Sequence, residues 1–112
     1  MSTYANIHVG DECFCICNDG FPFGTVPLLA PLIEKAKGSK YPEATLKGLL
    51  LENDVYLGTA ALASYDYTVQ ENTILFQIDG KQFKIEVREG RMYHNGREIT
   101  EGDLWKVLEL KS

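Results

Sequence analysis

The clearest indication of the fold is the stretch Ser64–Ile99, SYDYTVQENTILFQIDGKQFKIEVREGRMYHNGREI. It contains four dipeptides typical of tight turns: Glu71-Asn72, Asp79-Gly80, Glu89-Gly90 and Asn95-Gly96. Asp-Gly and Asn-Gly between alternating apolar and polar residues favour two-residue hairpin loops, because type I′ turns require positive φ. The stretch therefore predicts an antiparallel β-meander.

The registers of this meander can be tested for consistency. Two-residue loops at the first three turns pair Phe76 with both Tyr67 and Phe83, and pair Val87 with Met92. These pairings place the apolar residues on one face of the sheet: Tyr65, Tyr67, Val69, Ile74, Phe76, Ile78, Phe83, Ile85, Val87 and Met92. The opposite face is polar and holds Asp66, Thr68, Gln77, Gln82, Lys84, Glu86 and Arg88. Three turns that agree on one face predict a sheet with a core side and a water side.

Segments with helical spacing are predicted to cover the apolar face. Residues 25–39 carry leucines at helical intervals, and Pro31 predicts that this helix begins near it or kinks there. Residues 41–54 place Pro42 in a first turn. Their inward stripe is Leu46, Leu49 and Leu50. The segment Gly58–Ser64 is left without an assignment.

A third helix is predicted over residues 100–112. Thr100 and Asp103 form a pair resembling a capping box at its start. Its inward residues are Leu104, Val107 and Leu108. With the two helices above, this gives an α+β fold: an N-terminal β-hairpin plus a C-terminal antiparallel β-meander, with two or three helices on one face of the sheet.

The N-terminal hairpin contains all three cysteines, and its register is open. A two-residue loop at Gly10-Asp11 pairs His8 with Cys13. It then places these residues on one face together with Tyr4, Asn6, Cys15 and Cys17. A three-residue loop, Gly10–Glu12, turns the cysteines toward the core instead.

A zinc site and a catalytic nucleophile are two possible roles for the cysteines of this hairpin. Alternate positions along one strand separate the sulfurs by roughly 6–7 Å, which is too far for one tetrahedral zinc site. A cysteine nucleophile with His8 as its base lacks a recognisable orienting group and oxyanion hole. We therefore expect the cysteines to be structural, and we expect no metal, no cofactor and no catalytic residues.

The segment Asp19–Gly24 is the predicted binding site, formed by Asp19, Gly20, Phe21, Pro22, Phe23 and Gly24. A turn followed by Pro22 restricts the backbone, so two aromatic side chains on it would lose little entropy on binding. In an extended segment Phe21 and Phe23 point to the same side. The alternative is that both rings pack beneath the first helix.

The length, charge and composition of the chain limit the class of protein to which it can belong. A chain of 112 residues is expected to form a single domain, residues 1–112. The net charge of −5 without a clustered basic face argues against binding to a nucleic-acid backbone. There is no apolar run of about 18 residues and no secretory signal, so we expect no membrane association. Three closely spaced cysteines favour a cytoplasmic location.

Part of the chain resembles a group of small phage and bacterial proteins. Their signature is an Asn-Ile strand, a second strand, Asp-Gly-Tyr-Pro-x-Gly and a leucine-rich helix. Asn6-Ile7, Asp19–Pro22 and Gly24 match it, and Tyr65–Val69 is similar to a downstream Tyr-x-Tyr strand. The group's Tyr-Arg-His-like segment is replaced here by Cys15–Asn18, so a shared basic site is not expected. The resemblance implies a phage or mobile-element setting.

Three functions remain for the chain. The favoured one is a non-enzymatic interaction protein, a phage accessory factor that binds and modulates a host protein. The alternative is a small-ligand binder, for a nucleotide-like molecule, that uses the loop Asp19–Gly24. A second alternative is a Cys-dependent enzyme. The sequence is also compatible with a homo-oligomer.

Overall fold

The computed structural model describes the backbone of residues 3–17 and 20–109, and their side chains except those of Trp105, Leu108 and Glu109. The elements follow one another as β1 (Ala5–Val9), β2 (Glu12–Ile16), α1 (Pro22–Lys37), α2 (Pro42–Glu52), β3 (Tyr56–Leu57), β4 (Tyr65–Gln70), β5 (Thr73–Ile78), β6 (Lys81–Arg88), β7 (Arg91–His94), β8 (Arg97–Ile99) and α3 (Glu101–Glu109). The strands form one mixed sheet in the order β3-β2-β1-β4-β5-β6-β7-β8. The predicted α+β fold is confirmed.

The meander has the predicted register. Phe76 pairs with Tyr67 and with Phe83, and Val87 pairs with Met92. Three of the turns have positive φ at both residues, as type I′ loops require, whereas in the Glu71-Asn72 turn only Glu71 does, with φ of 55°. Most of the predicted inward residues are buried, and Tyr65 and Ile78 pack partly buried against the core.

The first hairpin takes the two-residue loop. His8 pairs with Cys13 and Asn6 with Cys15, so the cysteines lie on the face opposite the core residues Ile7 and Phe14. The hairpin and the meander are joined by a parallel pairing of β1 with β4, in which Val9 lies opposite Val69. This pairing makes the sheet mixed.

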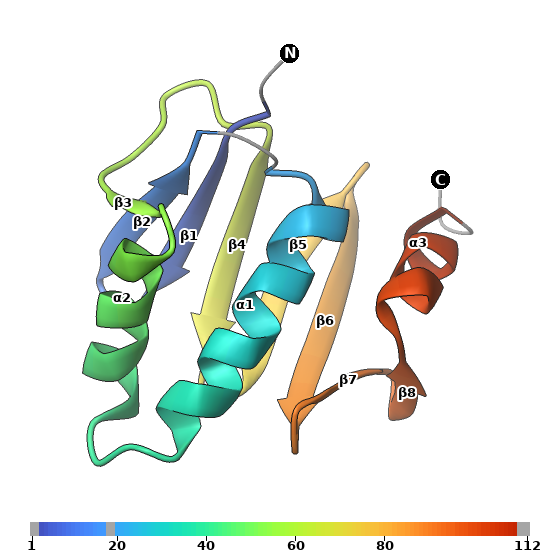
Figure 1. Ribbon diagram of the computed structural model, residues 1–112. Helices are drawn as coiled ribbons and strands as arrows, with labels where there is room; N and C mark the ends of the chain where they lie inside the picture. Colours follow the sequence, from blue (N-terminus) through green and yellow to red (C-terminus); the bar gives the residue numbers. More distant parts are fainter. Residues whose placement is uncertain (1–2, 18–19, 110–112) are drawn as a thin grey trace.

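Helices α1 and α2 pack beside each other across one face of the sheet, and α3 lies near β7 and β8 (Figure 1). The largest fully buried side chains come from both the sheet and the helices: Tyr67, Phe14, Ile7, Leu29, Leu50, Ile74, Ile85 and Leu104. The predicted stripe of α2 is buried as expected. Among residues 3–17 and 20–109, no helix lies on the opposite face of the sheet (Figure 1).

Helix α1 differs from the sequence prediction in its start. It begins at Pro22 and continues through Pro27 and Pro31, so a start near Pro31 is wrong, and a kink at Pro31 stays a prediction. Each interior proline removes a backbone donor from the helix, which costs stability. Pro27 is half-buried and Pro31 is exposed, whereas Val26 and Leu29 are fully buried, and their burial stabilises the helix.

The capping box of α3 is confirmed. The Thr100 N–H donates to the Asp103 carboxylate at 3.1 Å, and the Asp103 N–H donates to the Thr100 hydroxyl at 3.1 Å. Leu104 is fully buried and Val107 is partly buried against the core, whereas the side chain of Leu108 lies outside the described residues. Within the part of the chain that the structure describes, no helix is long and apolar enough to cross a membrane.

The unassigned segment Gly58–Ser64 is a loop between the edge strand β3 and β4. It is attached to the sheet by Asn6, whose side-chain oxygen accepts from the Ala60 N–H at 2.8 Å and whose amide donates to the Ala60 oxygen at 3.2 Å. These two bonds account for a buried asparagine on the helix-free face.

Candidate functional site

Gly20 marks the crossing from the sheet to α1. Its N–H donates to the Thr3 oxygen at 2.9 Å, and its own oxygen accepts from the Tyr67 hydroxyl at 2.7 Å. A side-chain carbon built on Gly20 would lie 2.8 Å from the Thr3 oxygen and 2.9 Å from the Ala5 Cβ. Glycine is therefore needed here for close approach to β1. Its neighbour Asp19 lies outside the described residues.

The segment after Gly20 corrects the prediction of an extended loop edge. Phe21 is the N-cap of α1, and Pro22 is its first residue. The Gly24 and Thr25 N–H groups donate to the Phe21 oxygen at 3.0 and 2.9 Å. Proline suits this position because its φ is preset and its missing N–H would have had no helical partner. Pro22 is buried, and Gly24 is half-buried.

Phe21 and Phe23 lie side by side at the amino end of α1. Their ring centroids are 6.4 Å apart with an interplanar angle of 18°, and the Phe21 ring lies 5.8 Å from that of Tyr65. Phe21 is 42% exposed and Phe23 is 40% exposed. The alternative of two rings packed beneath the helix is therefore not what the structure has. We call Phe21, Phe23 and Tyr65 the aromatic patch.

The aromatic patch continues into a row of rings in the core. Successive centroids from Tyr65 to Tyr67, then to Phe76 and Phe83, are 6.4, 5.4 and 5.5 Å apart. The row crosses β4, β5 and β6 on the face covered by helices. The exposed rings thus rest on side chains whose positions are fixed by packing.

His8, Cys13 and Cys15 lie on the same face of the first hairpin. The His8 Nε2 lies 3.2 Å from an Asp66 carboxylate oxygen, and the Cys13 Sγ donates to the Phe14 oxygen at 3.7 Å. Cys13 and Cys15 are half-buried, and Cys17 is exposed. Among the described residues no group of three or more His, Cys, Asp or Glu side chains could hold a metal ion.

Cys15 is expected to be alkylated by iodoacetamide more slowly than the exposed Cys17 near neutral pH. Burial raises the pKa of the Cys15 thiol, and the neighbouring Cys17 and Cys13 raise it further. A raised pKa lowers the thiolate fraction, and the thiolate is the nucleophile. Partial labelling followed by fragment-ion mass spectrometry measures the two rates. The difference between the two alkylation rates should become smaller in alkaline solution. Equal rates near neutral pH would contradict the raised pKa of Cys15.

A group of exposed apolar side chains was missed by the sequence reasoning. It lies on α2, on β3 and in the loop that follows, and consists of Leu51, Tyr56, Leu57 and Leu62. The strand β3 has only two residues, so no alternation in the sequence could indicate it. The exposed leucines of the group, Leu51, Leu57 and Leu62, have no local sequence feature that distinguishes them from core residues.

Comparisons of the chain with protein-family models, with curated proteins and with solved structures find no match. The resemblance to small phage and bacterial proteins stays a prediction.

Proposed function

We propose that the chain is a non-enzymatic interaction protein that binds a partner protein through the aromatic patch. The observation that carries this proposal is the exposure of two stacked phenylalanine rings at the start of α1. Aromatic side chains dominate the energetics of protein interfaces, and a few of them provide most of the binding energy.

The backbone beneath the patch supports the same function. Gly20 is held between Thr3 and Tyr67 by two hydrogen bonds, and Pro22 is buried in the first turn of the helix. Two rings on such a frame have little backbone freedom to lose when a partner binds, which favours affinity. From the resemblance to phage proteins, the proposed partner is a host protein whose activity is modulated.

The other functions have less support. The raised pKa of Cys15 does not favour a Cys-dependent enzyme, because it lowers the fraction of thiolate, which is the nucleophile. The segment Gly20–Gly24 offers backbone groups that are used in the fold, rather than polar groups turned toward a nucleotide-like ligand.

Phe21→Ala and Phe23→Ala are each expected to weaken partner binding by about 2 kcal/mol or more, as anchor residues do. Their midpoints of thermal unfolding should stay near that of the parent, because both rings are already partly in water. Proteins retained from a host lysate by the parent, and lost by both variants, identify the partner by mass spectrometry. Binding constants for the purified partner then give the size of the effect.

Leu62→Ala is the matched control, because Leu62 is 86% exposed and lies in the loop after β3. It should retain the same partner with unchanged affinity. If Phe21→Ala and Phe23→Ala lower stability by a few kcal/mol and leave binding unchanged, the rings are packing residues and the proposal is wrong.

A further inference from the structure

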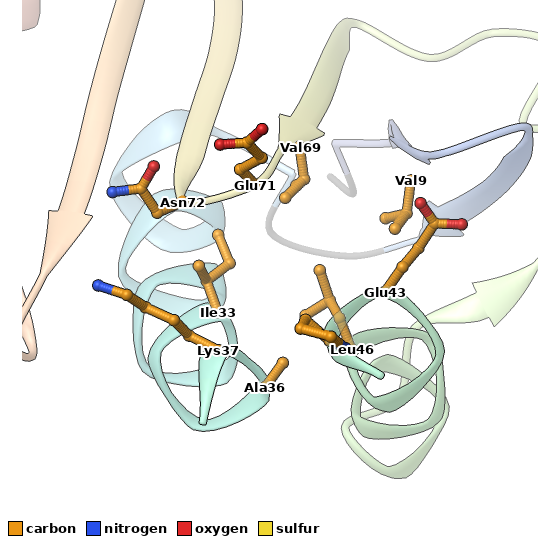
Figure 2. Close-up of a pocket in the computed structure, with 10 residues that line it drawn as sticks. Val9, Ile33, Ala36, Lys37, Glu43, Leu46, Val69, Glu71 and Asn72 are labelled. Atoms are coloured by element: carbon orange, nitrogen blue, oxygen red, sulfur yellow. The ribbon is translucent and has the colours of Figure 1, made fainter. Parts of the chain in front are cut away.

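A cavity of about 470 Å³ opens between α1 and α2, at the opposite end of α1 from the aromatic patch. Its floor is apolar: the side chains of Ile33, Ala36 and Leu46 face the space between the two helices (Figure 2). Val9, Val69 and Pro42 complete the apolar lining. The volume lies within the range of roughly 300–1,000 Å³ that is typical of small-molecule sites.

The topology places this cavity at the carboxyl ends of two neighbouring parallel strands. Val9 ends β1, and its partner Val69 lies next to the end of β4. Parallel neighbours end at the same edge of a sheet, and in open α/β sheets the crevice beyond those ends is where ligands bind. The turn between β4 and β5 forms one side of the mouth.

The mouth of the cavity is rich in hydrogen-bond acceptors. Glu43 is ion-paired with Lys47, whose Nζ lies 3.3 Å from its Oε2, and a carbon added at Gly10 would meet its carboxylate. The Asn72 amide nitrogen donates to the Val87 oxygen at 3.0 Å, so its side-chain oxygen is the group that remains for a ligand.

Glu71 adds a carboxylate for which the structure shows no hydrogen bond or ion pair within the described residues. It is exposed and lies in the turn between β4 and β5 at a φ of 55°. Lys37 also lines the cavity, and Figure 2 shows its side chain extending away from the space between Ile33 and Leu46.

We propose that this cavity binds a small organic cation, with an apolar body against Ile33, Ala36 and Leu46 and a protonated amine at the mouth near Glu71 and Glu43. An ammonium group provides donors only, which matches a mouth of carboxylate and amide oxygens. An anionic or phosphate-bearing ligand would meet the Glu71 carboxylate there, whereas Glu43 is paired with Lys47. This site is separate from the aromatic patch and does not depend on the proposed partner.

Three probes of similar shape and different charge test the ligand class: phenethylammonium, 2-phenylethanol and 3-phenylpropionate. Each is titrated into the uniformly ¹⁵N-labelled full chain at constant ionic strength. Phenethylammonium should shift the amide resonances of Ile33, Ala36 and Leu46 and bind about fivefold more tightly than the alcohol, from one partly exposed ion pair. The carboxylate should bind most weakly. Shifts elsewhere, no saturable binding, or equal affinity for all three overturn the proposal.

Glu71→Gln and Glu89→Gln form a matched pair of variants. Both residues are exposed first residues of a two-residue turn, with φ of 55° and 51°. Only Glu71 lines the cavity. Glu71→Gln should lower the affinity for phenethylammonium about fivefold and leave that for 2-phenylethanol unchanged. Glu89→Gln should change neither. If both variants lost the same affinity for phenethylammonium, the change in net charge alone would explain the loss, and the proposed contact with Glu71 would be wrong.

Ala36→Leu is expected to fill the floor and abolish binding of both phenethylammonium and 2-phenylethanol. If that variant does not fold, the comparison of Glu71→Gln with Glu89→Gln still tests the proposed site. Phe21→Ala should bind phenethylammonium as the parent does, so failure of this site and failure of the aromatic patch are distinguishable.

Discussion

Phe76→Ala is expected to lower the free energy of unfolding by about 3–5 kcal/mol, the cost typical of truncating a buried aromatic residue. Phe76 is only 4% exposed and lies in the middle of the meander. Its ring centroid is 5.4 Å from that of Tyr67 and 5.5 Å from that of Phe83. Removing it opens a void between two neighbours that are fixed by their own strands. Chemical denaturation of the parent and the variant measures the loss.

Gln77→Ala is the control, because Gln77 is the next residue of β5 and points to the helix-free face. Its replacement should cost under about 0.5 kcal/mol. Comparable losses for the two variants would show that the faces of the sheet are assigned wrongly.

Gly20→Ala is expected to lower the free energy of unfolding by about 1–3 kcal/mol, the range for forcing extra atoms into a packed site. The added carbon would press against the Thr3 oxygen and the Ala5 Cβ, neither of which is the end of a flexible side chain. A shift of Gly20 would also disturb the bond from the Tyr67 hydroxyl, which is 2.7 Å long.

Gly48→Ala, in contrast to Gly20→Ala, is expected to raise the free energy of unfolding. Gly48 lies inside α2, and a carbon added there meets nothing within 4 Å. Alanine is favoured over glycine in a helix interior by about 1 kcal/mol, so this variant should be more stable than the parent. Thermal unfolding of both variants should therefore move in opposite directions. A Gly20→Ala variant as stable as the parent would mean that the crossing to α1 is not closely packed.

The meander could be predicted from the sequence because its determinants are local. Alternation with a period of two and a turn dipeptide lie within a few residues of each other, and each turn fixes the register of the two strands beside it. The capping box of α3 and the leucine stripe of α2 are local for the same reason. The pairing of β1 with β4 left no such signal, since it joins segments that are far apart in the chain.

In the candidate sites, too, only features with local determinants could be predicted from the sequence. The two phenylalanines could be identified from their position beside Gly20 and Pro22, but the backbone there was predicted wrongly. Proline before an apolar segment suits both an extended loop and the first turn of a helix. The cavity is lined by residues from β1, α1, α2, β4 and one turn, so no single stretch of sequence could indicate it.

The parallel pairing between β1 and β4 also bears on the order in which the chain folds. The hairpins of the meander bring together residues that are close in sequence, so they form at a small cost in loop-closure entropy. Joining β1 to β4 requires the segment that contains α1, α2 and β3 to be enclosed in one large loop. We infer that the C-terminal half of the sheet forms first, and that docking of the N-terminal hairpin onto β4 is the slow step.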